Sequence, residues 1–315
     1  MKICCVIVTY NRKQLLVECI NSILQQTINV NNIIVVDNNS NDGTDELLQE
    51  NNLMDKITYK KLTKNIGGAG GFNFGIGESL KDIYDWVWIM DDDSIPTKTA
   101  LEELLNAQSI LKDENISFLC SKVIGMNNEE MNLPLISERN TENGYPIWMK
   151  YLDKSIVEVK AATFVSVLIK TEAVKKVGLP WKEFFLWGDD IEYTLRLNKY
   201  FGPGYVVGKS IVIHKRVNAR NISLVEESNS NRITLYKYKY RNDILLHEYN
   251  GKLKNFMLTT KQILNCILIL FKSNNFKYKK FKIATIGTLD GLLNIKLRKS
   301  FKNRFKSITN YSMGE

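Results

Sequence analysis

Apolar residues follow two alternating spacings along the first 215 residues of the chain. Short runs of mostly β-branched and aromatic residues are separated by segments in which apolar residues recur every three or four positions, the spacing of one helix face. This alternation is typical of an α/β fold whose parallel sheet carries helices on both faces. The expected strands are Ile3–Val8, Ile33–Val36, Ile57–Leu62, Trp86–Met90, Val157–Ile169 and Ile211–Ile213, and the expected helices lie at about 15–24, from Thr44, before Asp82, at 97–112 and from Asp189 to Tyr200.

Polar clusters stand where four successive predicted strands end. In parallel sheets, ligands bind beyond the carboxyl ends of the strands, so we expect these clusters to face one crevice. Taken alone, the second cluster is equally compatible with turn and helix-cap chemistry. The four clusters are Thr9–Arg12, Asp37–Ser40, Asn65–Gly68 and Asp91–Asp93.

Six of the 18 glycines fall between Gly67 and Gly77, in a predicted turn that leads into a helix. Glycine at such a position allows the backbone to approach a phosphate closely or to begin a helix. The spacing differs from the G-x-G-x-x-G fingerprint, and no P-loop G-K-[ST] motif is present. A dinucleotide-binding or P-loop enzyme is therefore not expected.

Three consecutive aspartates follow the apolar strand Trp86–Met90. One of them could cap a helix or lie in a solvated loop, but like charges repel unless a cation lies between them. Carboxylate oxygens suit Mg²⁺ or Mn²⁺, which the phosphates of a nucleotide would share. Asp91 and Asp93 point to one side of an extended segment, whereas Asp92 points away or toward substrate. His214, at the end of another predicted strand, is a candidate third ligand.

A second acidic pair, Asp189 and Asp190, opens a predicted helix directly after an aromatic segment. Acidic residues at a helix start often only complement the helix dipole. The functional alternative is that an acid beside Phe185 and Trp187 is partly desolvated, has a raised pKa and accepts a proton from a hydroxyl group. The aromatic rings would also suit stacking against a sugar.

Positive charge is concentrated at the end of the chain. Residues 231–315 carry 18 Lys and Arg but 4 Asp and Glu, whereas the first 230 residues carry 25 and 30. The shift predicts a domain boundary, with a catalytic domain at 1–225 and a basic, mainly helical region at 226–315. Positive charge interleaved with the aromatic residues of Tyr236–Tyr240 also suits nucleic acid. No recognised nucleic-acid-binding motif accompanies it, so we expect no nucleic-acid partner.

The longest uncharged apolar stretch, Gln262–Phe271, is ten residues, too short to span a bilayer. It is amphipathic and is followed by basic residues, a combination that favours docking on anionic lipid. The same apolar side chains could instead pack on the catalytic domain or form an oligomer contact. The basic cluster is Lys277, Lys279, Lys280 and Lys282.

The cysteines and the N-terminus indicate a cytoplasmic protein. The five cysteines are an odd number without C-x-x-C spacing, which fits a reducing compartment. The apolar run Ile3–Tyr10 has no small-residue cleavage site behind it, so we read it as a buried strand and expect no export signal. Combined with lipid docking, this predicts a peripheral protein on the inner face of the cell membrane.

Taken together and in this order, six motifs resemble the family 2 glycosyltransferases, which have the GT-A fold, over about residues 1–220. The triple aspartate, the Asn-x-Gly-Gly-Ala-Gly-Gly-Phe run and the Trp-x-Asp-Asp pattern are most similar to bacterial galactofuranosyltransferases, which use UDP-galactofuranose with Mn²⁺ or Mg²⁺. Rhamnosyltransferases of capsule and O-antigen assembly share the first two patterns. The motifs are VIVTYNR (6–12), IIVVDNNSNDGT (33–44), NIGGAGGFNFGI (65–76), WIMDDDS (88–94), FLWGDDIEYTLR (185–196) and IVIH (211–214).

The resemblance implies an inverting transfer of a sugar from a nucleotide-sugar donor to a hydroxyl group of a lipid-linked glycan. A bound cation would neutralise the departing diphosphate, and a base on the opposite face of the sugar would take the proton of the attacking hydroxyl. The segment 125–154 matches no motif, and we expect it to contribute to acceptor choice. The implied roles are donor binding by Thr9, Asn11, Arg12, Asp37, Asn65, Gly67, Gly68, Gly71 and Asp92, metal binding by Asp91, Asp93 and His214, acceptor binding by Trp187 and Asp189, and base catalysis by Asp190.

A sugar nucleotidyltransferase is a competing class, because it also combines an α/β sheet with paired acids and Mg²⁺. Such an enzyme needs a basic, glycine-rich phosphate loop near the N-terminus. Arg12 and Lys13 alone do not supply one. Glycosyl transfer is therefore the favoured reaction.

Overall fold

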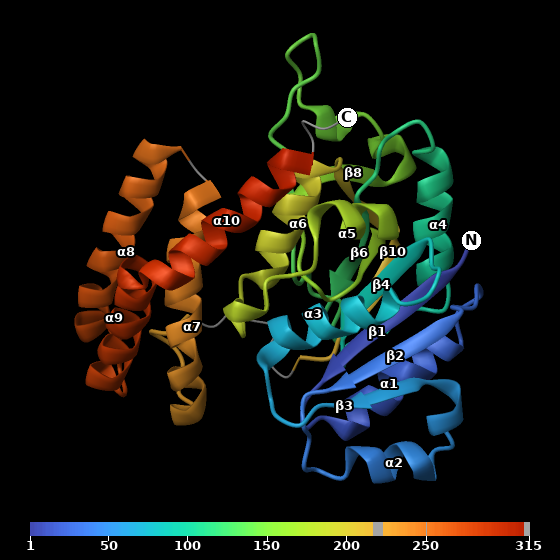
Figure 1. Cartoon of the computed structure of the whole chain (residues 1–315), viewed down its shortest axis with the longest axis horizontal. Helices are drawn as coiled ribbons and strands as arrows, with labels where there is room; N and C mark the ends of the chain where they lie inside the picture. Colours follow the sequence, from blue (N-terminus) through green and yellow to red (C-terminus); the bar gives the residue numbers. More distant parts are fainter. Residues whose placement is uncertain (217–222, 250, 312–315) are drawn as a thin grey trace. The chain divides into compact units, whose positions relative to one another are not determined.

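The computed structural model describes residues 1–216, 223–249 and 251–311. Strands and helices alternate up to His214, and four long helices follow (Figure 1). The strands are β1 Ile3–Thr9, β2 Asn32–Asp37, β3 Thr58–Lys61, β4 Trp86–Asp91, β5 Ser94–Pro96, β6 Phe118–Ile124, β7 Leu135–Ile136, β8 Ile156–Ala161, β9 Val167–Lys170 and β10 Gly204–His214. The helices are α1 Lys13–Leu24, α2 Thr44–Glu50, α3 Gly67–Ser79, α4 Ala100–Ile110, α5 Thr171–Val177, α6 Asp189–Tyr200, α7 Ser230–Leu246, α8 Lys252–Lys272, α9 Lys277–Leu293 and α10 Ile295–Tyr311.

The chain divides into two compact units. The first, the sheet unit, comprises Met1–Glu183 and Asp189–Ala219. The second, the helical unit, comprises Arg220–Glu315 together with the short segment Phe184–Gly188, which belongs to it although it precedes α6 in sequence. Sequence composition does not indicate this assignment of 184–188.

The sheet has the order β3-β2-β1-β4-β9-β6-β10-β8-β7, and β5 pairs with β10. The strands β3, β2, β1 and β4 are parallel, as expected. Beyond them the sheet is mixed, because β9 runs antiparallel to β4 and β6. The parallel pairing predicted from the first four strands is therefore confirmed, and the antiparallel strand β9 was not predicted. The apolar run Val157–Ile169 forms two strands, β8 and β9, instead of one, and periodicity alone does not reveal that break.

Helices cover both faces of the sheet, which confirms the α/β prediction. On one face, Ile3, Cys5 and Ile7 of β1 share a core with α1, α2 and α4. On the other face, the ring of Phe164 lies edge-on to Phe72 of α3 and to Tyr193 of α6. All five cysteines are buried and free, so their thiols serve as small apolar groups.

A buried ion pair fixes α6 within the sheet unit. The guanidinium of Arg196 donates to both carboxylate oxygens of Glu192, with Nε–Oε1 and Nη2–Oε2 distances of 2.8 and 3.0 Å. It also donates to the carbonyl oxygens of Val177 and Leu179. Neither charged side chain is more than 2% exposed. Glu192, which lies in the motif FLWGDDIEYTLR, thus helps to hold α6 in place through Arg196.

We expect Arg196→Met to lower the free energy of unfolding by about 3–5 kcal/mol, because it leaves the Glu192 carboxylate buried without its partner. Urea denaturation followed by circular dichroism measures the change. Lys81→Met is the matched control, since Lys81 is 69% exposed in its ion pair with Glu78 and pairs with an exposed partner contribute about 1 kcal/mol or less. Equal losses of unfolding free energy in both variants would show that the buried ion pair stabilises the fold no more than the control pair does.

The helical unit has its own small core. This core contains Ile233 and Tyr236 of α7, Cys266 of α8, Ala284 of α9 and, before α7, Leu224. Gly287 and Gly291 of α9 lie so close to α7 that a Cβ at Gly287 would meet the carbonyl oxygen of Lys237 at 2.3 Å. Close helix packing therefore requires glycine there. Within the described residues, no helix is long and apolar enough to cross a membrane.

One of the predicted basic side chains belongs to this interior. Lys280 is buried, and its Nζ donates to the carbonyl oxygen of Val225 and to Asn275 Oδ1, each at 2.7 Å. The amphipathic pattern placed Lys280 in an exposed cluster, which was wrong. The positive charge of Lys280 does not by itself reveal that its ammonium group is buried and hydrogen-bonded to Val225 and Asn275.

Candidate functional site

The ends of β1 and β4 are joined by charged hydrogen bonds. Thr9 Oγ1 donates to Asp92 Oδ2 at 2.7 Å. Arg12 Nη1 donates to Asp92 Oδ1 at 3.2 Å and to Asp93 Oδ2 at 2.6 Å. Two of the predicted clusters thus form a single group at one edge of the sheet.

Hydrogen bonds link the other two clusters to this group. The backbone N–H of Asn11 donates to Ser40 Oγ at 2.9 Å. Asn38 Nδ2 donates to the carbonyl oxygen of Gly67 at 3.1 Å, and Asn65 Oδ1 accepts from the Gly67 N–H at 2.7 Å. The sheet therefore brings all four strand-end clusters together, as the parallel pairing of β1, β2 and β4 predicts.

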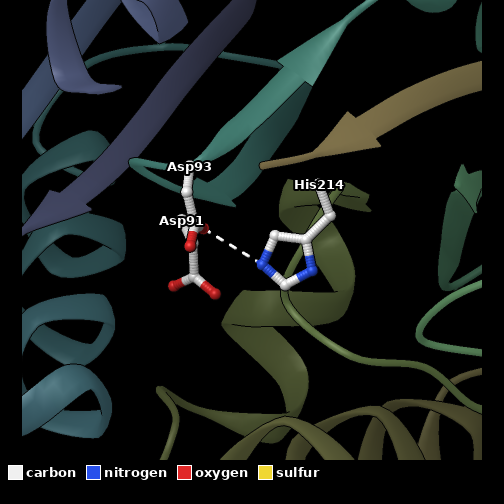
Figure 2. A group of neighbouring side chains, drawn as sticks. All are labelled: Asp91, Asp93 and His214. Atoms are coloured by element: carbon white, nitrogen blue, oxygen red, sulfur yellow. Dashed lines mark hydrogen bonds and ion pairs between the residues drawn. The ribbon is translucent and has the colours of Figure 1, made fainter. Parts of the chain in front are cut away.

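Asp91, Asp93 and His214 converge at the centre of this group. One potential ligand atom from each lies within 4.8 Å of the others, and Figure 2 shows both carboxylates beside the imidazole. Although β4 and β10 are not neighbours in the sheet, β5 follows Asp93 directly and pairs antiparallel with β10, which sets Ser94 opposite His214. The pairing of β5 with β10 thus places His214 beside the aspartates.

The hydrogen bonds of His214 suit a metal ligand. Its Nδ1 lies 2.9 Å from Asn132 Oδ1, and its Nε2 lies 3.1 Å from Asp93 Oδ1. Both partners are acceptors, so the imidazole can donate to both only when both of its nitrogens carry a proton, whereas a neutral ring that donates from Nδ1 would present the Nε2 lone pair to a carboxylate. A cation at Nε2 would take the place of the second proton, and an acceptor that takes the Nδ1–H is the usual support for a ligating histidine. Two carboxylates and one imidazole therefore fit Mn²⁺ or Mg²⁺.

Burial and mutual repulsion shift the pKa values of the aspartates. Burial and the charges of Asp93 and Asp92 raise the pKa of Asp91 well above its usual range. Burial raises the pKa of Asp92 to about 6, although Arg12 acts in the opposite direction. Burial also acts to raise the pKa of Asp93, but the hydrogen bond and charge of His214, together with Arg12, outweigh it and lower that pKa. Concentrated negative charge in a buried place favours a bound cation.

The glycine-rich segment is helical from its start. The helix α3 begins at Gly67, so most of the expected turn is its first turn. A Cβ at Gly71 would lie 2.5 Å from Val8 Cγ1, and one at Gly75 would lie 2.4 Å from Val6 Cγ1. Glycine at these two positions lets α3 pack against the sheet. At Gly68 a Cβ would meet no atom within 4 Å.

Asp37 lies inside the protein. One carboxylate oxygen accepts from the Ser40 N–H at 2.7 Å, and the other accepts from the Tyr59 hydroxyl. Burial and the bond to Asp37 raise the pKa of Tyr59. These bonds give Asp37 a clear part in shaping the loop after β2.

Asp189 and Asp190 form the start of α6. Burial, followed by the charge of Asp190, raises the pKa of Asp189 well above its usual range. Asp190 is half-buried, and its Oδ1 accepts from the Ile191 N–H at 2.8 Å. The charge of Asp189 also contributes to the raised pKa of Asp91, so the two acidic groups act on each other.

The aromatic residues before the two aspartates pack against α7. The Phe185 and Tyr238 rings are stacked at 4.5 Å, and the Trp187 and Tyr236 rings are 5.0 Å apart. That these two rings desolvate the acid stays a prediction. The structure gives them partners of their own within the helical unit.

Asn132 is a residue of this site that sequence reasoning missed. It lies in the segment 125–154, which carries no motif, and it meets His214 across 82 positions of sequence. A left-handed backbone at Asn132, with φ of 48°, aims its side chain and is tolerated by asparagine better than by most residues. No local signal marks such a partner.

The chain belongs to glycosyl transferase family 2, whose family model matches residues 4–168. It is therefore a member of a family of glycosyltransferases. Galactofuranosyltransferase GlfT1 of Mycolicibacterium smegmatis is 27% identical over 205 residues, which is 62% of this chain and 65% of that protein. Abequosyltransferase RfbV of Salmonella typhimurium is 33% identical over 153 residues, 47% of this chain and 44% of that protein. The chain thus spans less than two thirds of these two relatives.

A third relative is similar over most of its length. Poly(ribitol-phosphate) beta-N-acetylglucosaminyltransferase TarP of Staphylococcus aureus is 25% identical over 309 residues, 93% of this chain and 88% of that protein. Among solved structures, S. aureus TarS residues 1–349 covers 100% of this chain and 92% of its own, with a TM-score of 0.57 and 16% identity. The structure of GalNAc-T7 with UDP, GalNAc and Mn²⁺ covers 77% of this chain and 51% of its own, with a TM-score of 0.55 and 15% identity. These likenesses confirm the GT-A fold.

Proposed function

We propose that this chain is an inverting, metal-dependent glycosyltransferase that moves a sugar from a nucleotide-sugar donor to a hydroxyl group during polysaccharide synthesis. The observation that carries the proposal is the convergence of Asp91, Asp93 and His214 at the strand ends, next to Thr9 and Arg12. Membership of glycosyl transferase family 2 supports the same reaction class.

In this proposal the chain's own residues divide the work. Thr9, Asn11 and Arg12 bind the nucleotide, and Arg12, whose side chain is half exposed, reaches the diphosphate. Asp37 meets the base or ribose. The donor also lies against Asn65, Gly67, Gly68 and Gly71 and near Asp92. Asp91, Asp93 and His214 would hold Mn²⁺ or Mg²⁺, which when bound neutralises the charge of the departing diphosphate.

Asp190 then acts as the general base, and Trp187 with Asp189 binds the acceptor. A carboxylate at the start of α6 that takes the proton of the attacking hydroxyl increases the nucleophilicity of its oxygen as the bond to the sugar forms. The proton ends on Asp190, and the nucleoside diphosphate leaves from the opposite face of the sugar. Attack from that side inverts the anomeric centre.

The proposed donor is UDP-galactofuranose and the proposed acceptor is a lipid-linked glycan. The 27% identity to a galactofuranosyltransferase supports this donor, and dTDP-rhamnose is the alternative. The structures of TarS with UDP and of GalNAc-T7 with UDP and Mn²⁺ support a uridine nucleotide and a divalent metal. Because TarP is a beta-N-acetylglucosaminyltransferase, UDP-N-acetylglucosamine is a further donor to test.

A donor screen tests the proposal. Purified full-length protein is incubated with each labelled nucleotide sugar, Mn²⁺ or Mg²⁺ and a lipid-linked acceptor analogue, and the products are identified by mass spectrometry. A glycosylated acceptor with released UDP supports glycosyl transfer. A parallel incubation with a nucleoside triphosphate and a sugar 1-phosphate that releases pyrophosphate would instead indicate a nucleotidyltransferase. No turnover of any nucleotide sugar would contradict the proposal.

We also propose that the helical unit docks the enzyme on anionic lipid at the inner face of the membrane. Several apolar side chains on α8 are exposed, among them Leu264, Ile267 and Phe271, which is 77% exposed. The basic side chains of Lys272, Lys277 and Lys282 are exposed as well. Apolar contact and positive charge together give interfacial binding, each basic group adding about 1 kcal/mol.

The full-length protein is expected to co-sediment with vesicles that contain anionic phosphatidylserine and to be released as salt screens the charges. Replacing Leu264 and Phe271 by serine should reduce the bound fraction at least about fivefold, because α8 then loses apolar area. Ile83→Ser is the matched control, since Ile83 is 83% exposed but lies in the sheet unit. Failure of the unaltered protein to bind at low salt would rule out docking and leave this face of α8 to an oligomer contact.

A further inference from the structure

The orientation of the His214 ring decides whether it can serve the proposed metal site. Figure 2 shows one ring nitrogen facing the carboxylates of Asp91 and Asp93 and the other nitrogen on the far side of the ring. The nitrogen that faces them is Nε2, which lies 3.1 Å from Asp93 Oδ1. A half-turn of the ring about the Cβ–Cγ bond would put a carbon atom in the place of Nε2. The site therefore requires a group that prevents this turn.

Asn132 supplies that group on the far side of the ring. Its Oδ1 lies 2.9 Å from Nδ1 of His214. An amide oxygen only accepts hydrogen bonds, so Nδ1 carries the proton of this bond. The half-turn would exchange that N–H for a carbon and break the bond. A ring whose Nδ1–H is taken by an acceptor keeps Nε2 as the nitrogen for a cation.

The loop after β6 brings Asn132 to this place within the sheet unit. β6 pairs parallel with β10, and the register sets Val123 opposite Val212. The chain leaves β6 and returns at once, because the Met131 N–H donates to the Val123 carbonyl oxygen at 3.2 Å. The Met131 side chain is 5% exposed and shares a small core with Val123 and Val212. Asn132 follows Met131 directly, and His214 follows Val212 by two positions, so the two side chains meet.

We propose that Asn132 is a positioning residue for the metal site: it fixes the His214 ring so that Nε2 faces the cation held with Asp91 and Asp93. The inference rests on the proposed metal dependence of the enzyme. In this role Asn132 contacts neither the cation nor the substrate and acts through His214. Part of the segment 125–154, which matches no motif, thereby supports the metal site.

Loss of the hydrogen-bond partner of a ligating histidine typically lowers metal affinity by about 10–100-fold. Asn132→Gly tests this, because Asn132 has a φ of 48° and glycine adopts the left-handed region without strain. The Kd for Mn²⁺ is expected to rise by about 10–100-fold. Electron paramagnetic resonance of free Mn²⁺, during titration of the full-length protein, measures it. The titration is made with Mn²⁺ alone and repeated with UDP, whose diphosphate shares the cation in the proposed function.

Asn128→Gly is the matched control. Asn128 lies in the same loop, has a φ of 63° and is exposed, so the same change is made on the same kind of backbone away from His214. Its Kd for Mn²⁺ should equal that of the unaltered protein. Without metal, the two glycine variants are expected to melt at similar temperatures.

The conservative variant Asn132→Asp keeps an acceptor oxygen, and aspartate also tolerates the left-handed region. A carboxylate that accepts from Nδ1 raises the basicity of the ligating nitrogen. This variant should therefore bind Mn²⁺ at least as tightly as the unaltered protein. A loop that merely needed asparagine for its shape would not distinguish Asn132→Asp from Asn132→Gly in this way.

A double variant separates positioning from general damage. In the His214→Ala background no ring is left to orient, so adding Asn132→Gly should change the Kd for Mn²⁺ by less than about twofold. An unchanged Kd in Asn132→Gly, equal losses in the two glycine variants, or an Asn132→Asp protein as weak as Asn132→Gly would each overturn the inference. If the unaltered protein binds no Mn²⁺, or His214→Ala binds it equally well, the proposed metal site fails instead.

Discussion

Asp93→Ala is expected to reduce glycosyl transfer by at least about 10³-fold, because it removes both a proposed metal ligand and the partner of His214. In the proposed mechanism negative charge develops on the departing diphosphate, and Arg12, which already pairs with Asp92 and Asp93, is not expected to neutralise it alone. A loss of about 4 kcal/mol of transition-state stabilisation corresponds to that factor. Steady-state rates with saturating donor measure it.

Two further measurements make this result specific. Asp153→Ala removes an exposed carboxylate of the sheet unit, 68% accessible, and should leave the rate unchanged. Mn²⁺ should raise the melting temperature of the unaltered protein but not of Asp93→Ala, since a ligand that binds only the folded state stabilises it. Normal turnover of Asp93→Ala, or of the unaltered protein in excess EDTA, would contradict metal dependence.

The sequence predicted the parallel half of the sheet well, because β1, β2 and β4 are mostly buried on both faces and form continuous apolar runs. The strand Trp86–Asp91 ends within one residue of the predicted bound. The other half was harder to predict. The run 157–169 contains β-branched and apolar residues in both of its parts, and the turn between β8 and β9 is marked by neither glycine nor proline.

The same contrast holds for the candidate site. Asp91–Asp93 could be predicted to meet Thr9–Arg12 because strand order alone places their carboxyl ends side by side. Asn132 and Arg196 act through partners that only the tertiary structure brings near, across 82 and 19 positions. Lys280 shows the converse, since a basic side chain in a basic segment was read as exposed and is buried.

Asp190→Asn is expected to lower kcat by about 10²–10⁴-fold, the usual contribution of a general base. The amide has the shape of the carboxylate, and its oxygen can still accept from the Ile191 N–H, so the start of α6 should be preserved. It cannot take the proton of the acceptor hydroxyl. Donor affinity should persist, because in the proposed mechanism Asp190 acts on the face of the sugar opposite the nucleotide.

Rates with saturating donor and acceptor measure the loss, and equilibrium binding of UDP measures what is retained. Glu172→Gln makes the same chemical change at an exposed acid of α5, 70% accessible, and should leave both quantities unchanged. An Asp190→Asn protein that binds UDP weakly but keeps its maximal rate would move Asp190 from proton transfer to donor binding. A protein that keeps both would leave the base to be sought at Asp189, whose raised pKa reflects burial beside Asp190.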